Sequence, residues 1–424
     1  MKYFIRKICI LSIGIIFLAG LFSPSPASQR GGKEIAKSNI DKSVNPRVDF
    51  YDYAVGNWIK KTKIPSSYPA WNTFYELNDN NYHKLKFILL KAEKDKDAKE
   101  GSISQKVGDF FYTGMDTTKI EEEGMKPIEA ELKAIDRIRT KKDFYSQLAL
   151  IHLSYNRPLF SFFSAPDAKN SKMEIAQLNQ SGLGLPDRDY YLKDDNNTKE
   201  IREKYLRHVE NMFVLIGENS KIADQDANTI LEIETRLAKA SMSRVKMRDP
   251  KNTYHKISVK KLIENYPEFQ WDEYFALIGI QNPGSLNVRQ PKYFKEVDKM
   301  VKSIPLKKWK SYLKWNVIRA AAPYISSKFE KEHFNFYGTI LYGIKTMQPR
   351  WKRVLGTINS HVGELLGQLY VKRYFPPKAK ARAKKIVLNL MDVFASRIKN
   401  LNWMSPVTKK QALKKYISIK KILI

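Results

Sequence analysis

The sequence predicts a mainly α-helical, packed globular protein. Over long stretches apolar residues recur three or four positions apart, the spacing that puts them on one face of an α-helix. Aromatic residues make up 12% of the 424 residues, which is enough to fill a large core and excludes a disordered polypeptide. A chain of this length accommodates one large domain or two medium ones.

The first 27 residues have the features of an export signal. Three basic residues precede an apolar run at 8–22, and small residues ending at Ala27 suit cleavage after that position. As a helix the run would reach about 22 Å, short of the roughly 30 Å hydrocarbon core of a bilayer. We therefore expect a removed signal peptide at 1–27 and an exported protein, periplasmic or secreted, without a lasting membrane anchor. The alternative is an uncleaved segment that anchors the protein.

The single cysteine, Cys9, lies inside this signal. The remaining chain then has no thiol, which excludes disulfides, cysteine-based metal sites and a cysteine nucleophile. A polar run with two adjacent glycines predicts a linker at 28–44.

Residues 45–58 predict the first helix, and Gly56 is its expected end. After a turn-rich connection at 63–69, helical spacing resumes. Two short runs at 159–163 and 173–178 have strand composition around a polar turn, which predicts a β-hairpin.

The stretch at 182–192, GLGLPDRDYYL, is predicted to join that hairpin to a long helix. Two glycines allow a tight turn, and the proline favours entry into a helix. The two tyrosines supply apolar anchors with hydroxyl groups. We interpret the stretch as a structural hinge.

Helices dominate the rest of the chain. Thr198 is the expected cap of a helix that ends at Gly217, and Ser220 the expected cap of the next helix. A loop at 281–285 precedes a helical block that extends from 309 to 397. Ser405 is expected to cap the last helix.

The formal net charge is +31, and residues 371–424 hold fifteen Lys and Arg residues but only Asp392 as an acid. Such an excess can attract nucleic acid or an anionic membrane. The simpler interpretation, which we favour, is a lysine-rich chain whose helices expose solvated charges. No nucleic-acid partner is expected.

Catalytic motifs can be tested directly because few residues qualify. None of the six histidines is followed by Glu, so the chain has no HExxH motif. His361 and Glu364 have the spacing of an inverted zinc motif, but Leu365 stands where its second histidine belongs. His208, on the apolar face of its helix, is expected to be a core residue. We therefore predict no catalytic and no metal-binding residue.

Several motifs do, however, agree in order and spacing with one family. They are LGLPDRDYYL at 183–192, RVKMRDP at 244–250, QPRWKR at 348–353, GELLGQLYV at 363–371 and WMSPVTK at 403–409, preceded by the start of the region at 45–58. Together they resemble the neprilysin and endothelin-converting-enzyme family of zinc metalloendopeptidases, including its bacterial oligopeptidases.

The resemblance implies a multi-helix cap of the neprilysin-type fold at 45–402, which encloses the substrate cavity. Residues 403–424 would be the truncated start of an incomplete catalytic part. Zinc is the cofactor of the intact family, but its ligands have no counterpart in this chain. The resemblance therefore implies oligopeptides and a missing catalytic half as partners, and a chain that is inactive as supplied.

The resemblance also points to one weak substrate-binding candidate. In animal members, arginines near a W/G-x-F segment bind the carboxylate end of the peptide. Aligned on Phe74, their positions here are Ala70 and Asn78. Asn78 either hydrogen-bonds a peptide or is simply an exposed helix residue.

Two other classes of function stay open. One is a non-catalytic module that binds peptides or proteins, and the other is a binder of anionic surfaces through residues 371–424. Without a catalytic half, Trp403, Tyr416, Ile417, Ile419 and the apolar end at 422–424 are expected to lack cover and to favour association.

Overall fold

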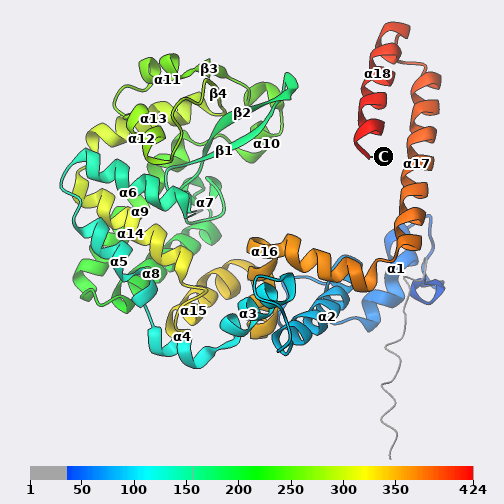
Figure 1. Ribbon diagram of the computed structural model, residues 1–424, viewed down its shortest axis with the longest axis horizontal. Helices are drawn as coiled ribbons and strands as arrows, with labels where there is room; N and C mark the ends of the chain where they lie inside the picture. The colour runs from blue at the N-terminus through cyan, green and yellow to red at the C-terminus, as the bar shows by residue number, and fades with distance from the viewer. Residues whose placement is uncertain (1–35, 155, 424) are drawn as a thin grey trace, which may run out of the picture. The chain divides into compact units, whose positions relative to one another are not determined.

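The computed structural model describes residues 36–154 and 156–423, and the side chains of 36–418 apart from residue 155 (Figure 1). The expected signal peptide, Cys9 and the first part of the expected linker lie outside these residues. Contacts divide the chain into two units, one ending at Ile64 and the other beginning at Pro65. As predicted, the chain is mostly helical.

The first unit contains the short η1 (Lys37–Asn39) and α1 (Phe50–Lys61). The prediction that Gly56 ends the helix was wrong, because α1 continues beyond it to Lys61. Gly56 is buried against Asp41, and a Cβ at this position would lie 3.0 Å from the Asp41 Cβ. The glycine therefore serves close packing, with residues of the expected linker folded onto the helix.

The second unit contains two separate hydrophobic cores. Helices and a small sheet from Lys126 to Ile340 build the larger core. The helical elements are α5 (Lys126–Asp136), α6 (Lys141–Leu153), α7 (Asp189–Leu192), α8 (Asn196–Leu215), α9 (Ser220–Ala240), α10 (Arg244–Met247), η2 (Pro250–Asn252), α11 (Val259–Asn265), α12 (Trp271–Leu277), α13 (Pro291–Ser303), α14 (Leu306–Ala321), α15 (Ser327–His333) and the π-helical η3 (Phe334–Ile340).

Two helix caps differ from the prediction by one to three residues. Asp195, not Thr198, caps α8 and accepts a hydrogen bond from the Thr198 amide. Asn219, not Ser220, caps α9. In both cases a better acceptor lies just upstream in the sequence. Gly217, with φ +99°, follows the end of α8 as expected.

The predicted hairpin is present as β1 (Phe160–Asp167) and β2 (Asn170–Gln180), paired antiparallel. Two further strands extend the sheet in the order β1-β2-β4-β3. They are β3 (Lys256–Ser258) and β4 (Ser285–Val288), and β4 pairs with β2 in parallel. Three or four residues are too few to show the alternation by which a strand is recognised in a sequence.

The smaller core lies between α2 (Thr73–Glu93), α3 (Ile103–Met115) and α16 (Arg350–Tyr374). Leu89, Phe111 and Ile358 are buried where the three helices meet. Two chain segments connect this core with the larger one: α4 (Thr117–Glu123) after α3, and residues 341–349 before α16. The segment at 341–349 leads into α16, which completes the smaller core by packing on α2 and α3, two helices far earlier in the sequence.

The last two helices are α17 (Pro377–Asn400) and α18 (Pro406–Leu423), which pack on each other. Ser405 caps α18 as predicted, accepting a hydrogen bond from the Thr408 amide. Trp403 and Ile417 are exposed, as expected, but Tyr416 is buried and donates a hydrogen bond to Asp392 on α17. The expectation for Tyr416 was wrong because the two helices cover it.

The segment at 182–192 forms a hinge around a buried carboxylate. Gly182 has φ +90°, and the Cβ of any residue at Gly184 would lie 1.8 Å from the Tyr205 hydroxyl oxygen. That tyrosine and Tyr191 donate hydrogen bonds of 2.9 and 2.7 Å to the fully buried Glu234 of α9. The stretch thus joins the hairpin to the long helix α8, as predicted.

Replacing Gly184 tests this close approach. Gly184→Ala is expected to lower the free energy of unfolding by about 2–3 kcal/mol, because the new methyl group must displace Tyr205 from Glu234. Gly367→Ala on α16, where a Cβ meets nothing within 4 Å, is the control and should be neutral or stabilising by up to about 1 kcal/mol. Urea denaturation of both variants makes the comparison, and equal stabilities would contradict the assignment.

Candidate functional site

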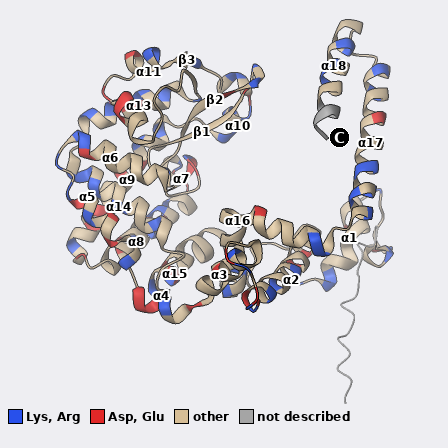
Figure 2. Cartoon of the chain, viewed as in Figure 1, with Lys and Arg blue, Asp and Glu red and all other residues tan. Residues whose placement is uncertain are grey.

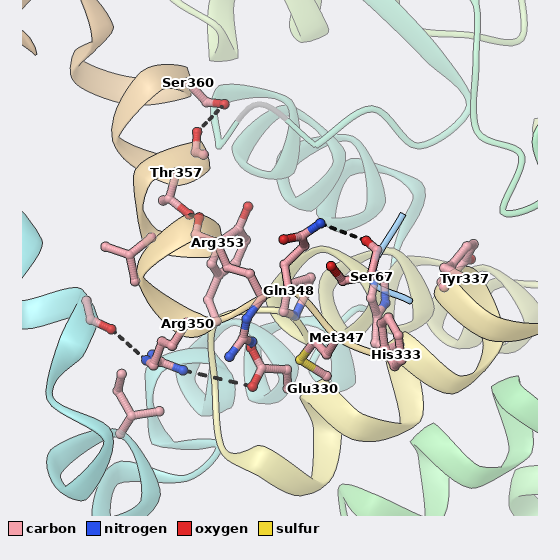
Figure 3. Close-up of a pocket in the computed structure, with 18 of the residues that line it drawn as sticks. Ser67, Glu330, His333, Tyr337, Met347, Gln348, Arg350, Arg353, Thr357 and Ser360 are labelled. Atoms are coloured by element: carbon pink, nitrogen blue, oxygen red, sulfur yellow. Dashed lines mark hydrogen bonds and ion pairs between the residues drawn. The ribbon is translucent and has the colours of Figure 1, made fainter. Parts of the chain in front are cut away.

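A cavity of about 780 Å³ lies where the two cores of the second unit meet (Figure 3). Its walls come from α3, α4, α15, η3, α16 and the segment at 341–349. The residues that line it are Ser67, Phe110, Thr113, Gly114, Ile120, Pro323, Tyr324, Glu330, His333, Phe334, Tyr337, Gly338, Tyr342, Ile344, Met347, Gln348, Arg350, Arg353, Val354, Gly356, Thr357 and Ser360.

One wall carries a cluster of charges that joins the cores. Arg353 of α16 pairs with Glu330 of α15, and an Arg350 Nη1 lies 3.9 Å from the same carboxylate. Arg350 also donates from Nε to the Gly114 carbonyl of α3, at 2.8 Å. Figure 3 shows these side chains together beside the start of α16. Burial lowers the pKa of both arginines, which nevertheless stay charged.

Three polar atoms of this wall are buried without a hydrogen-bond partner among the described residues. They are Gln348 Oε1, Arg353 Nε and His333 Nδ1. The other end of the Gln348 amide donates from Nε2 to the Ser67 carbonyl, at 2.7 Å, which holds its side chain in place. These three atoms are enclosed within the wall, and no hydrogen bond in the described structure satisfies them.

Burial keeps the imidazole of His333 neutral. It lowers the pKa of His333 to about 4, with the nearby His208 and Arg319 acting in the same direction. Its ring lies 4.6 Å, between centroids, from Tyr337, which also lines the cavity. His208 is buried in the larger core, as predicted, and its Nδ1 lies 2.8 Å from the Glu332 carboxylate.

The donor groups of the described residues do not fit a catalytic zinc. Three His, Asp or Glu ligands are needed in such a site, and no group of three that could hold a metal occurs among the described residues. His361 is exposed and its Nδ1 contacts the Thr357 carbonyl of its own helix. The 424-residue sequence also lacks the HExxH pattern. No catalytic step through zinc can be assigned to these residues.

The structure does not bring the weak candidate Asn78 to the cavity. Asn78 lies exposed on α2, one turn after Phe74, which is 82% exposed, and its side chain makes no hydrogen bond within the described part of the chain. Ala70 is also exposed, just before this helix. The role of Asn78 stays a prediction.

Sequence reasoning missed most of the cavity. Arg350 and Arg353 stand in the motif at 348–353, but without a role assigned to either. Their partner Glu330 and the neighbouring His333 come from another helix and had no signal of their own. The motif at 348–353, whose two arginines precede a stretch with helical spacing, was the sequence signal that pointed to this part of the cavity.

Basic side chains are unevenly distributed. The helices that build the larger core carry both Lys or Arg and Asp or Glu, whereas α17 and α18 carry almost only basic charge (Figure 2). No helix in the described ranges is long and apolar enough to cross a bilayer.

Comparison with known sequences gives consistent matches. Residues 46–423 match the sequence profile of peptidase family M13. Human endothelin-converting enzyme 1 is 28% identical over 425 aligned positions, covering 96% of this chain and 54% of that protein. Membrane metallo-endopeptidase-like 1 of Mus musculus is 26% identical and covers 90% of this chain and 52% of its own length. The chain thus spans about half the length of the curated relatives it matches.

Solved structures show the same fold. Zinc metalloprotease Zmp1 of Mycobacterium tuberculosis, in complex with an inhibitor, superposes with a TM-score of 0.84 at 29% identity, over 90% of this chain and 58% of that one. PepO from Lactobacillus rhamnosis HN001 has a TM-score of 0.77 at 19% identity, over 88% and 59% of the two chains.

Removing the shared carboxylate should uncouple the two cores. Glu330→Gln is expected to lower the free energy of unfolding by about 2–3 kcal/mol, because two partly buried arginines lose their counter-charge. Glu232→Gln, which breaks an exposed pair with Lys308, should cost less than about 0.5 kcal/mol. Urea denaturation measures both, and similar losses would show that the Glu330 cluster contributes no more than a surface pair.

The neutral imidazole should make stability depend on pH. In the unfolded chain His333 binds a proton as the pH falls below its ordinary pKa of 6.5. In the folded chain the same imidazole stays neutral until about pH 4. The contribution of this residue to stability is therefore fully present well above pH 6.5 and is lost as the pH falls through 6.5 to about 4, by about 3 kcal/mol in total. The difference in unfolding free energy between wild type and His333→Gln should narrow or reverse over that range, and parallel curves would contradict the assignment.

Proposed function

Because the chain belongs to peptidase family M13, we propose that it forms the helical amino-terminal part of a zinc metalloendopeptidase that hydrolyses oligopeptides. The family match over residues 46–423 carries this proposal. In it, residues 45–402 enclose the substrate, and residues 403–424 begin the part that would hold the metal. The chain would bind and confine peptides without cleaving them by itself.

The lack of a suitable donor set supports the inactive state. In the metallopeptidases that use HExxH, two histidines bind the metal and the glutamate acts as base. This chain has no such pair, and its described residues do not converge on a metal. The zinc-bearing part would therefore be supplied by a segment beyond these 424 residues or by a separate chain.

An exposed apolar stripe on α17 supports a partner of this kind. Leu390 follows Ile386 by four residues and is followed by Val393 and Phe394 at three and four residues, and each of the four is 55% exposed or more. A stripe at helical spacing is normally buried against another element. We propose that the zinc-bearing part covers it, and that without this partner the chain associates with itself.

The remaining assignments are part of the same proposal. Asn78 would hydrogen-bond the peptide backbone, since its exposed side chain on α2 is free to do so. Residues 1–27 would direct export to the periplasm or the medium, followed by a linker at 28–44.

Zinc content and peptide cleavage test the proposal. The purified chain should contain no stoichiometric zinc by metal analysis and should leave a mixture of fluorogenic oligopeptides intact. Adding a separately produced zinc-bearing half of an M13 relative should restore cleavage that a chelator removes. Chelator-sensitive cleavage by the chain alone would overturn the proposal.

Peptide binding separates the two functional classes that remain. Binding without cleavage in both the absence and the presence of the zinc-bearing half would favour a non-catalytic peptide-binding module. In the restored enzyme, Asn78→Ala should raise KM several-fold at constant kcat, whereas Asn80→Ala, two residues along the same helix and also exposed, should change neither constant.

A further inference from the structure

We propose that the free edge of β1 forms an antiparallel pair with β1 of a second copy of this chain, related to the first by a two-fold axis at Phe163. The proposal does not depend on the peptidase assignment, and it uses a surface other than the apolar stripe on α17. Three observations carry it: the direction in which the backbone groups of the strand point, the way the free edge ends on both sides, and its lack of charge.

The hydrogen bonds of β2 show which backbone groups of β1 are free. The amide of Arg289, just after β4, donates to the Leu178 carbonyl at 2.9 Å, so the backbone groups of Leu178 point towards β4 and away from β1. Phe162 of β1 stands opposite Leu178. Because such a pair exchanges no hydrogen bonds, the N–H and C=O of Phe162 point outward, as do those of Ser164 two residues along. No hydrogen bond to these groups occurs within the described residues.

The free edge ends at a defined residue on both sides. The Phe160 amide donates to the Pro158 carbonyl at 2.7 Å, so it is not available to a new strand. Pro166, two residues after Ser164, has no amide hydrogen, and β1 accommodates it because this position also points outward. The strand therefore offers the complete backbone groups of Phe162 and Ser164 to one short antiparallel ladder.

A second copy of β1 matches this edge. When two copies meet antiparallel about Phe163, Phe162 of each copy lies opposite Ser164 of the other, and each such pair exchanges both its hydrogen bonds, about four in all. The two Phe163 rings, half-buried in the single chain, then lie next to each other across the axis, where an aromatic pair is favourable. The same strand thus supplies both sides of a two-fold symmetric contact.

The edge also lacks charges that would oppose self-association. Residues 158–166 contain no charged side chain, in a chain whose formal net charge is +31. Asp167, the next residue, is paired with Lys256 at 2.8 Å. Lysines on an edge strand block pairing of this kind in many proteins, and the sequence of β1 has none. A neutral edge of this kind fits a second copy better than a highly charged partner.

A single introduced thiol can trap the pair. In the full chain with Cys9→Ser, Phe163→Cys would place two thiols opposite each other with Cα atoms about 4.5 Å apart, within the roughly 4.4–6.8 Å that a disulfide needs. Oxidised glutathione serves as the oxidant, and non-reducing gel electrophoresis measures the cross-linked dimer. Phe163→Cys should cross-link at least tenfold faster than Ala165→Cys, which in this pairing lies away from the axis, opposite Ser161 of the other copy.

Three further variants, each made in the Phe163→Cys chain, separate the edge from other surfaces. Ser164→Pro removes one outward amide without breaking a hydrogen bond to β2, as Pro166 does, and should slow cross-linking at least tenfold. Ser164→Ala keeps the amide and should change the rate less than about twofold. Leu390→Glu, on the stripe of α17, should also leave the rate unchanged.

Several outcomes would overturn the pairing: absent cross-linking, equal rates for the two cysteine variants, no effect of Ser164→Pro, or loss of cross-linking in Leu390→Glu. If Phe163→Cys does not fold, hydrogen exchange of the unmodified chain decides. The amides of Phe162 and Ser164 should then exchange several-fold more slowly as the concentration of the chain rises. Exchange that is independent of concentration would reject the proposal.

Discussion

A single buried carboxylate organises the larger core. Glu234 of α9 accepts hydrogen bonds from Tyr191 of the hinge and Tyr205 of α8, and the indole of Trp315 donates to that second hydroxyl at 2.9 Å. Burial raises the pKa of Glu234, while the charge of Arg319 and the two hydroxyls oppose the shift. Removing a partner from such a group leaves a buried charge unsatisfied, which makes the arrangement of these helices specific.

The same network extends to the cavity. Arg319 donates to the Leu183 carbonyl at 2.8 Å, and Tyr337 donates to the Gly184 carbonyl at 3.1 Å. Tyr337 is at once a wall of the cavity and a contact of the hinge. The backbone of the hinge thus positions η3, and η3 in turn positions one side of the cavity. Glu330, on the preceding helix, then fixes the arginines of α16.

Local patterns predicted most of the fold. Helices α8 and α9 were recognisable because three- and four-residue spacing is a property of the helix itself. The family resemblance, carried by motifs along the chain, is confirmed. The errors lie where distant residues decide. Gly56 was predicted to end the helix because its packing partner, Asp41, lies fifteen residues upstream, outside the apolar spacing from which the helix was predicted.

The cavity could not be predicted for a similar reason. Its charged wall pairs Arg353 of α16 with Glu330 of α15, a separate helix earlier in the chain. Its unpaired polar atoms can be recognised only when all their neighbours in the described structure are known. Neither property produces a recognisable pattern in a single sequence. Tyr416 shows the opposite error, since an apolar terminal helix looked uncovered until α17 was seen to pack on it.

The late position of α16 has a consequence for biosynthesis. Helices α2 and α3 can pair as soon as they are made, but the apolar face that they present to α16 stays open. Roughly 240 residues follow before that helix emerges, which at about 5–20 residues per second takes on the order of tens of seconds. In that interval the larger core can fold first. The apolar faces of α2 and α3 stay exposed on the nascent chain until α16 is made, and a chaperone bound to these two helices would shield them from association.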